Sequence, residues 1–274
     1  MKSIKCLGDD QMSEILLAMD NVEISYNARP YVRDISFQLK EGEILGIVGE
    51  SGSGKSTLIK AAMGLLGPTG AVTKGHVYYK GENILDYNSQ EFQNIRGYEM
   101  GMIFQNSESA LCPVRTIGDQ LYESMSQHKK ITKEEAKSKG LVLLDKLNFK
   151  DGNRILKSYP FELSGGMNQR VGIMMAMLLK PSLLFADEPT SALDVTIQLQ
   201  VIREMMKMRD EYGTAIVIVS HNIGVISYMA DTVVVMKEGN IVEYGTKDQI
   251  VFHPQEEYTK NLIEAVPRVR RENG

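Results

Sequence analysis

The amino-acid sequence predicts an α/β fold with a parallel sheet at its centre and a smaller antiparallel sheet beside it. Four short, uniformly apolar runs are separated by longer helix-forming segments, which is the pattern of buried parallel strands. These runs are residues 44–48, 183–186, 215–219 and 232–236. Three further segments alternate apolar and polar residues, as half-buried antiparallel strands do. They are residues 22–26, 32–39 and 75–79.

Local signals add a helical region and one tight hairpin. We expect residues from about 112 to 165 to be mainly helical, because Thr132 and Glu135 form a capping box and leucines at 141, 144 and 147 lie along one helix face. Residues 237–240 read Lys-Glu-Gly-Asn between two apolar stretches, which predicts a β-hairpin turn.

Composition excludes several classes of function. The chain has 274 residues and a formal net charge of -4, so it lacks the basic face that nonspecific nucleic-acid binding requires. Its two cysteines, Cys6 and Cys112, show no metal-ligand spacing and suit a reducing compartment. The apolar run 15–19 is too short for a signal peptide, and no run approaches the ~20 residues of a membrane-spanning helix.

Residues 49–57 give the strongest functional signal. They fit the phosphate-binding pattern G-x-x-x-x-G-K-[ST], between a predicted buried strand and an apolar helix at 58–63. The glycines let backbone N–H groups turn toward phosphate oxygens, and the helix start adds a positive dipole end. A flexible linker is the alternative, but linkers lack such flanks. The nucleotide-binding residues predicted here are Gly49, Glu50, Ser51, Gly52, Ser53, Gly54, Lys55, Ser56 and Thr57.

Within this loop two side chains have specific expected roles. Lys55 is placed to reach the β- and γ-phosphates of a nucleoside triphosphate. The Ser56 hydroxyl is placed to complete the oxygen shell of a Mg²⁺ ion.

Asp187 and Glu188 form a second candidate site. They follow the apolar run 183–186, at the end of a parallel strand where ligands bind in open α/β sheets. We expect Asp187 to hold Mg²⁺ and Glu188 to accept a proton from the water that attacks the γ-phosphate. A surface acid pair that merely ends a strand is the alternative.

The segment from Leu163 to Arg170 reads L-S-G-G-M-N-Q-R. It resembles the signature motif of the ATP-binding cassette (ABC) ATPases, which implies an ABC-type nucleotide-binding fold with a RecA-like parallel core, an antiparallel β-subdomain and a helical subdomain. In that family Ser164, Gly165 and Gly166 bind the ATP of a partner subunit in a head-to-tail dimer. A serine-capped helix start is the plain alternative. The methionines at 174, 175 and 177 are expected to be core residues.

The resemblance covers residues 14 to 265 and implies further roles. Tyr26 matches the aromatic residue that stacks on adenine, and Gln105 matches the glutamine that joins the Mg²⁺ shell with Ser56 and Asp187. His221 matches the histidine that contacts the γ-phosphate. Residues 191–194 match the loop that links the two ATP sites. The implied catalytic residues are Glu188, His221 and Gln105, with ATP and Mg²⁺ as cofactors.

Within the family the chain resembles the D-type ATPase subunit of dipeptide, oligopeptide and nickel importers. Residues 104–113 are similar to F-Q-(D/E)-P-x-x-(S/A)-L-N-P, and methionine follows L-S-G-G as in D-type subunits. Three places depart from the pattern: Asn106-Ser107 replaces acid-proline and Cys112 replaces asparagine; Asn222 replaces an aspartate; Asn168 stands where arginine is common. These departures leave the groups at the phosphates unchanged.

The resemblance implies a single ABC ATPase domain over 14–265, with a helical subdomain at roughly 106–170, a leader at 1–13 and a tail at 266–274. It implies a peripheral location on the cytoplasmic face of the cell membrane and two membrane permease subunits as partners. It further implies a second, F-type ATPase in a head-to-tail dimer and, indirectly, an extracytoplasmic solute-binding protein; no nucleic-acid partner is expected.

The transported solute is either nickel or a chelated metal, or di- and oligopeptides. No cysteine follows Cys112, so the chain cannot supply the thiolates of an iron–sulfur cluster found in some peptide-type tails, and this favours nickel. A soluble ABC ATPase without a membrane partner and an inactive ATP-binding module remain as alternatives.

Overall fold

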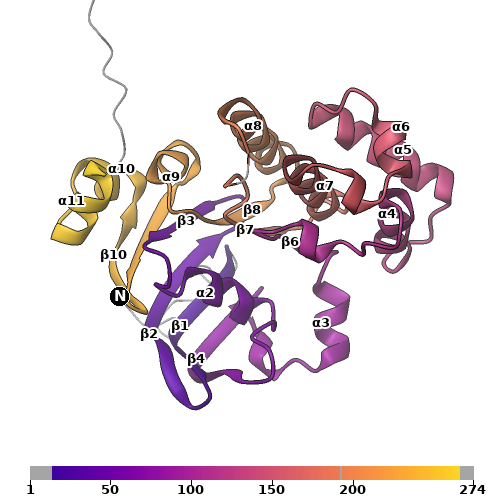
Figure 1. The fold of residues 1–274 in the computed structure, drawn as a ribbon. Helices are drawn as coiled ribbons and strands as arrows, with labels where there is room; N and C mark the ends of the chain where they lie inside the picture. Colours follow the sequence, from indigo (N-terminus) through magenta and orange to yellow (C-terminus); the bar gives the residue numbers. More distant parts are fainter. Residues whose placement is uncertain (1–13, 192, 266–274) are drawn as a thin grey trace, which may run out of the picture.

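The computed structural model describes residues 14–191 and 193–265 and contains two sheets with helices packed around them (Figure 1). The larger sheet has six strands in the order β10-β9-β3-β8-β7-β6. Every neighbouring pair from β9 to β6 is parallel, and only β10 is antiparallel to its neighbour. In chain order the strands are β3 (Ile44–Gly49), β6 (Met100–Ile103), β7 (Leu183–Asp187), β8 (Ala215–Val219), β9 (Thr232–Lys237) and β10 (Asn240–Thr246).

The four predicted parallel strands are therefore confirmed, and the structure adds β6 and β10. Residues 100–103 were not expected to form a strand, because a four-residue run containing Gly101 carries little local signal. They become one only by pairing with β7.

The second sheet is antiparallel and has the order β2-β1-β4-β5. Its strands are β1 (Ile15–Tyr26), β2 (Arg29–Lys40), β4 (Gly70–Tyr79) and β5 (Glu82–Asn83). All three predicted antiparallel strands are present, but each is longer than predicted. The run 15–19 is the first part of β1, which is buried along most of its length because it lies between β2 and β4.

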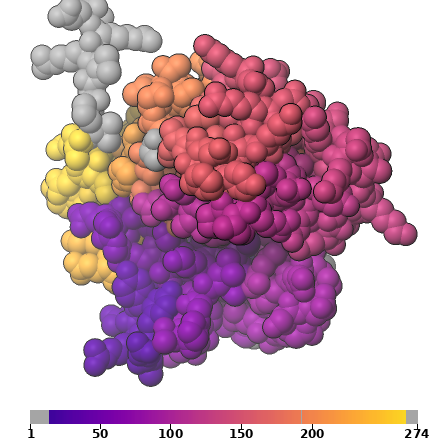
Figure 2. Space-filling model, turned by 45° about the vertical axis from the view of Figure 1, so that its right-hand side comes forward, coloured from indigo at the N-terminus to yellow at the C-terminus, as the bar shows by residue number. Residues whose placement is uncertain are grey.

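Helices cover both faces of the larger sheet. They are α2 (Lys55–Ala62), α3 (Ser89–Ile95), α4 (Ile117–Ser126), α5 (Lys133–Lys146), α6 (Gly152–Lys157), α7 (Gly165–Met177), α8 (Val195–Tyr212), α9 (Ile223–Met229), α10 (Lys247–Phe252) and α11 (Glu257–Glu264). Within the described residues, 3-10 turns are formed by Ile84–Asp86, Glu108–Ala110 and Pro160–Glu162. In Figure 2 the rose residues of the helical region lie above the indigo and purple residues of the antiparallel sheet.

Two apolar cores lie on opposite faces of the six-stranded sheet. Side chains alternate along β3, so that Ile44 and Val48 join one core and Leu45 and Ile47 join the other. The first core contains α7, α8 and α9, and the second contains α2 and the antiparallel sheet. Consequently α2 and α7 are held on opposite faces of the same sheet.

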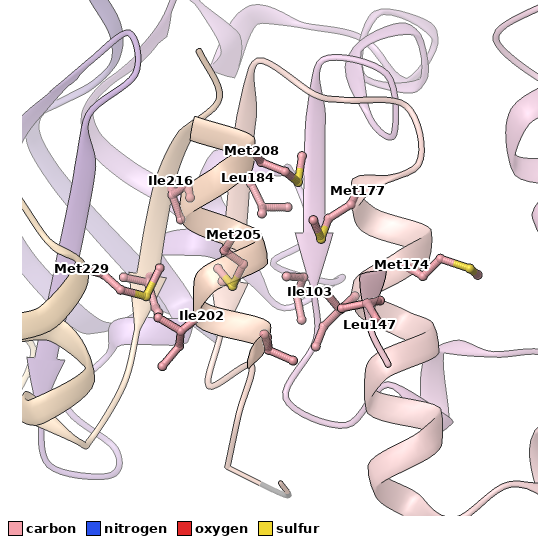
Figure 3. Packing of buried hydrophobic residues seen from close by; sticks show 14 of the residues in the cluster. Ile103, Leu147, Met174, Met177, Leu184, Ile202, Met205, Met208, Ile216 and Met229 are labelled. Carbon is pink, nitrogen blue, oxygen red and sulfur yellow. The ribbon is translucent and has the colours of Figure 1, made fainter. Parts of the chain in front are cut away.

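Methionines make up much of the core around α7 and α8. Figure 3 shows Met174, Met177, Met205, Met208 and Met229 within this cluster. All five are buried, and the neighbouring Met175 is partly buried against the same cluster. The unbranched, flexible methionine side chain fills irregular space between helices. The expected core role of Met174, Met175 and Met177 is confirmed.

The two local predictions are also confirmed. The Thr132 hydroxyl accepts from the Glu135 N–H at 3.2 Å, and Glu135 accepts from the Thr132 N–H at 2.9 Å, which completes the capping box of α5. Glu238 and Gly239 both have positive φ, +48° and +81°, as a two-residue hairpin between β9 and β10 requires. Within the described residues, no helix is both long and apolar enough to cross a membrane.

Candidate functional site

The phosphate-binding sequence forms a loop between β3 and α2, as predicted. Gly49, Gly52 and Gly54 have φ values of +152°, +82° and +100°, which residues with a side chain rarely adopt. A Cβ on Gly49 would lie 2.1 Å from the Met236 carbonyl oxygen, so the loop passes too close to β9 for any side chain there. The glycines thus let the loop turn back over the start of α2.

Two tyrosines from distant elements hold this loop. The Tyr31 hydroxyl donates to the Gly52 carbonyl oxygen at 2.8 Å. The Glu50 N–H donates to the Tyr258 hydroxyl at 3.0 Å, which ties the loop to α11. Neither tyrosine was predicted, because no local pattern shows that β2 and α11 approach the loop.

Lys55 begins α2 and lies inside the loop, with only 5% of its surface exposed. Its Nζ donates to the carbonyl oxygens of Gly49 at 2.9 Å and Glu50 at 2.7 Å. Burial lowers the pKa of Lys55, whereas the nearby carboxylates of Glu188 and Asp187 act in the opposite direction. The ammonium group is therefore held inside the loop, close to both predicted acids.

Ser56 and Asp187 meet across the sheet. The Ser56 Oγ donates to Asp187 Oδ1 at 2.7 Å, although 131 residues separate them in the sequence. Burial raises the pKa of Asp187, and the Ser56 hydrogen bond partly opposes this rise.

These two oxygen ligands suit Mg²⁺, which prefers oxygen and keeps several waters. Among the described residues no group of three or more His, Cys, Asp or Glu side chains is placed to hold a metal. The Ser56 hydroxyl and the Asp187 carboxylate fit an ion that phosphate oxygens and water also coordinate.

Glu188 lies between the other two predicted catalytic residues. Gln105 Nε2 donates to Glu188 Oε2 at 3.1 Å, and His221 Nδ1 lies 3.2 Å from Glu188 Oε1. Glu188 has a φ of +45°, an uncommon conformation for a residue with a side chain. Its N–H donates to the Val219 carbonyl oxygen at 3.0 Å, so this backbone is fixed directly after β7 ends. Such strain is typical of functional positions.

Tyr26 lies at the end of β1, partly buried. Its ring packs edge-to-face against Tyr31, with centroids 5.9 Å apart. A Cβ on Gly70 would lie 2.6 Å from Tyr26 Cε1, so the start of β4 closely covers part of the ring. Tyr26 and Tyr31 together form an aromatic pair beside the phosphate loop.

The predicted signature residues are not part of this cluster. Ser164 is the N-cap of α7, and its hydroxyl accepts from the Met167 N–H at 3.3 Å. Ser164 and Gly165 are exposed, and a Cβ on Gly165 would meet no atom within 4 Å. The helices α7 and α2 pack on opposite faces of the sheet.

The predicted linking loop at 191–194 begins three residues after Glu188. Ser191 Oγ donates to the Glu188 carbonyl oxygen at 3.1 Å, and the Asp194 carboxylate caps α8. Ala192 falls outside the described residues.

Gln169 belongs to the signature segment, but no local pattern assigns it a role. It is buried and donates to the carbonyl oxygens of Phe104 and Pro189. These two hydrogen bonds depend on how α7 packs against the loops of Phe104 and Pro189.

The sequence of this chain is similar to those of known ATP-binding proteins of transport systems. Residues 32–191 match the family model described as ABC transporter. The chain is 40% identical over 261 residues to the dipeptide transport ATP-binding protein DppD of Bacillus subtilis, covering 93% of this chain and 78% of that protein. It is 37% identical to the oligopeptide transport ATP-binding protein AmiE of Streptococcus pneumoniae (95% and 75% covered), and 42% identical to OppD of Haemophilus influenzae (87% and 73% covered).

Solved structures agree with the sequence relatives. The dimeric cassette MJ0796, described in a post-hydrolysis state bound to ADP and Pi, superposes with a TM-score of 0.77 at 26% identity. The superposition covers 85% of this chain and 99% of that one. The predicted fold class is thereby confirmed. The chain belongs to the ABC transporter family and is one of its ATPases.

Proposed function

We propose that the cluster at the carboxyl edge of the six-stranded sheet is the ATP-hydrolysis site, with Glu188 as the general base. One observation carries this proposal: Lys55, Gln105, Glu188 and His221 each follow one of the adjacent parallel strands β3, β6, β7 and β8. Parallel strands end at a common edge, where ligands bind in α/β sheets. Four chemically distinct side chains therefore lie at the same edge of the sheet.

Each residue has a role that follows from its contacts. Glu188 accepts a hydrogen bond from Gln105 at Oε2, and His221 Nδ1 lies 3.2 Å from its Oε1. These two contacts hold the carboxylate in place as the proposed general base. Lys55 exchanges its backbone carbonyl partners for phosphate oxygens, a stronger charge-assisted interaction. Ser56, Asp187 and Gln105 are the proposed Mg²⁺ residues. Bound Mg²⁺ supplies positive charge that offsets the charge of the phosphate oxygens.

Nucleotide contacts complete the proposed site. The loop 49–57 cradles the phosphates with its N–H groups. Tyr26 provides the aromatic surface for adenine, and its contact with Tyr31 fixes it beside the loop.

We propose that a second ATPase subunit completes each site with its own signature helix. Ser164 and Gly165 are exposed at the start of α7, and Gly166 beside them is half-buried. A helix N-terminus attracts phosphate through its N–H groups and dipole. The MJ0796 cassette, with which this chain superposes, is itself dimeric, which supports a head-to-tail pair here.

A groove beside the Gln105 loop is the proposed permease contact. It has a volume of about 450 Å³ and lies between the end of α2 and helices α4 and α7. Leu65 and Phe104 line it, and they are 38% and 40% exposed, whereas its α4 side carries polar residues such as Glu123 and Gln127. This apolar floor with a polar rim fits an amphipathic helix, supplied here by the cytoplasmic loop of a membrane permease. Two permeases, one for each ATPase, would place the chain peripherally on the cytoplasmic face of the membrane.

The proposed cargo is a dipeptide or oligopeptide. The relatives named above are described as dipeptide or oligopeptide transport proteins. This supports peptides over the nickel that the sequence alone favoured. An extracytoplasmic solute-binding protein would deliver the peptide to the permeases.

Gene deletion and complementation test this function. Cells lacking the gene should lose uptake of labelled di- or oligopeptides, and the wild-type gene should restore it, whereas the E188Q gene should not. Nickel content is measured in the same cultures. If the deletion strain has a lower nickel content and unchanged peptide uptake, the proposed cargo is wrong. The proposed ATP-hydrolysis site would be unaffected by that result.

The docking groove has its own test. L65E places a charge on the apolar floor and should reduce both recovery of the chain with permease-containing membranes and peptide uptake, while ATP binding stays normal. F252E is the matched control, because Phe252 is 67% exposed on α10 and does not line the groove. Equal membrane recovery for L65E and wild type would exclude this groove as the contact.

A further inference from the structure

Gln169 is a buried polar residue whose hydrogen-bonding groups all point away from its own helix. It lies in the second turn of α7 and is 3% exposed. Its Nε2 donates to the Phe104 and Pro189 carbonyl oxygens, both at 3.0 Å. Its Oε1 accepts from the Ser107 N–H at 3.3 Å. One side chain therefore satisfies three backbone groups in two different loops.

One of these loops carries Gln105, which contacts the Glu188 carboxylate, and the other carries Glu188 itself. Phe104 directly precedes Gln105, and Pro189 directly follows Glu188. Gln105 and Glu188 are in turn joined by a hydrogen bond of 3.1 Å. The contacts therefore form a closed ring. It runs from Gln169 through the loop of Gln105, across the hydrogen bond to Glu188, and back through Pro189 to Gln169.

The packing around this ring leaves little freedom. Ser107 is 2% exposed, and a Cβ on Gly172, one turn after Gln169, would lie only 2.2 Å from Ser107 Oγ. The loop therefore lies directly against α7. The hydrogen bond from the Ser107 N–H to Gln169 Oε1 joins the loop to the helix at this point of close packing.

The same helix begins with the exposed signature residues. Ser164 caps α7, and Gln169 follows five residues later on a continuous helix. A helix of this length moves as a rigid element, so a displacement of its N-terminus reaches Gln169 directly.

We propose that Gln169 is a positioning residue that fixes the Glu188 carboxylate relative to the signature helix. When a nucleotide held on a partner subunit binds at Ser164, α7 is displaced. Gln169 passes this displacement to the loops that carry Gln105 and Glu188 and so determines their positions. Gln169 touches neither nucleotide nor water, and acts through Glu188. This proposal rests on the role of Glu188 as the base proposed above.

The first test separates binding from turnover. Q169M keeps the length of the side chain but removes its donors and acceptor, leaving three backbone groups without their partner. We expect kcat for ATP hydrolysis to fall about tenfold, with the affinity for ATP within about twofold of wild type. N168L is the matched control: Asn168 is 1% exposed on the same helix, and its Nδ2 donates to Pro160, outside both loops. N168L should keep the wild-type kcat; an equal loss of kcat in both variants would show that Gln169 only stabilises α7.

The second test asks whether Gln169 acts through Glu188. In the E188Q background, Q169M should cause no further loss of single-turnover hydrolysis, because the group it positions is already absent. A further tenfold loss would contradict the proposal.

A third measurement does not depend on catalysis. Hydrogen exchange of peptides covering 104–107 and 188–191, without nucleotide, should be faster in Q169M than in wild type and N168L. The φ of Ser107 is -68°, which proline adopts, so S107P removes the N–H while S107A keeps it. S107P should raise exchange at 104–106, and S107A should not. Unchanged exchange in Q169M would overturn the proposed link. Faster exchange together with wild-type hydrolysis by E188Q would instead show that the link exists and that Glu188 is not the base.

Discussion

Gln105 and Glu188 are 83 positions apart in the sequence, yet Gln105 Nε2 donates to Glu188 Oε2 at 3.1 Å. The contact arises because β6 and β7 are parallel neighbours, and each residue lies just beyond the end of its strand. It places an amide against one oxygen of the proposed base, while His221 lies against the other oxygen. The position of this carboxylate therefore depends on three strand ends rather than on one loop.

The first prediction is that E188Q hydrolyses ATP about 10²-fold more slowly than wild type, because glutamine cannot accept the proton of the attacking water. Glutamine keeps the shape of the side chain, so ATP binding should persist and the nucleotide-bound dimer should accumulate. Phosphate release and equilibrium binding of ATP measure the two effects. Wild-type turnover by E188Q would remove Glu188 from the proposed role.

The second prediction is that K55A and S164R fail at different steps. K55A removes the ammonium that lies inside the phosphate loop, so the affinity of the single chain for ATP should fall at least tenfold. S164R places a large side chain at the exposed start of α7, so ATP binding by the single chain should stay normal while turnover is lost. Titration with ATP and a hydrolysis assay distinguish the variants; similar losses of binding in both would contradict a site shared between subunits.

The third prediction concerns stability and pH. Burial raises the pKa of Asp187 above its ordinary value of 3.8, so the folded protein binds this proton more tightly than the unfolded chain does. Ionisation of Asp187 therefore costs stability above the raised pKa, and the cost disappears below pH 3.8.

D187N should consequently raise the free energy of unfolding near pH 7 in the absence of nucleotide, because asparagine still accepts from Ser56 without a buried charge. It should also abolish Mg²⁺-dependent hydrolysis. Urea unfolding at several pH values gives the stability difference, which should shrink as the pH falls toward 4. A D187N protein that is less stable than wild type at pH 7 would show that the carboxylate is stabilising in the fold.

The fourth prediction is that the purified chain alone is mainly monomeric and hydrolyses ATP weakly. Each proposed site takes its signature helix from another subunit, and the D-type resemblance implies that this subunit is a different, F-type ATPase. Light scattering with Mg-ATP measures the mass, and E188Q is included because slow hydrolysis favours any dimer that forms. A stable and fully active homodimer of the wild-type chain would indicate an importer with two identical ATPases.

Much of the fold follows from short-range patterns. The parallel strands at 44–48 and 215–219 are uniformly apolar because both faces of the central sheet are buried, and this property is visible in the sequence itself. The phosphate loop is likewise a local structure, since its glycines, its strand and its helix are contiguous. The carboxylates of Asp187 and Glu188 were predictable for the same reason: they directly follow a buried strand.

Other features depend on which elements meet. The pairing of β6 with β7 gives residues 100–103 their strand conformation and brings Gln105 to Glu188. The contacts of Tyr31 and Tyr258 with the phosphate loop depend in the same way on where β2 and α11 pack.

The sequence by itself determined the class of fold, the phosphate loop and the acid pair, because each is encoded by neighbouring residues. Only the tertiary structure decided that Gln169 joins the loops of Gln105 and Glu188 to the signature helix. The reason is physical: a buried amide takes whichever backbone groups the packing leaves without partners. Those groups come from segments up to 65 residues away, and nothing in the local sequence of α7 specifies them.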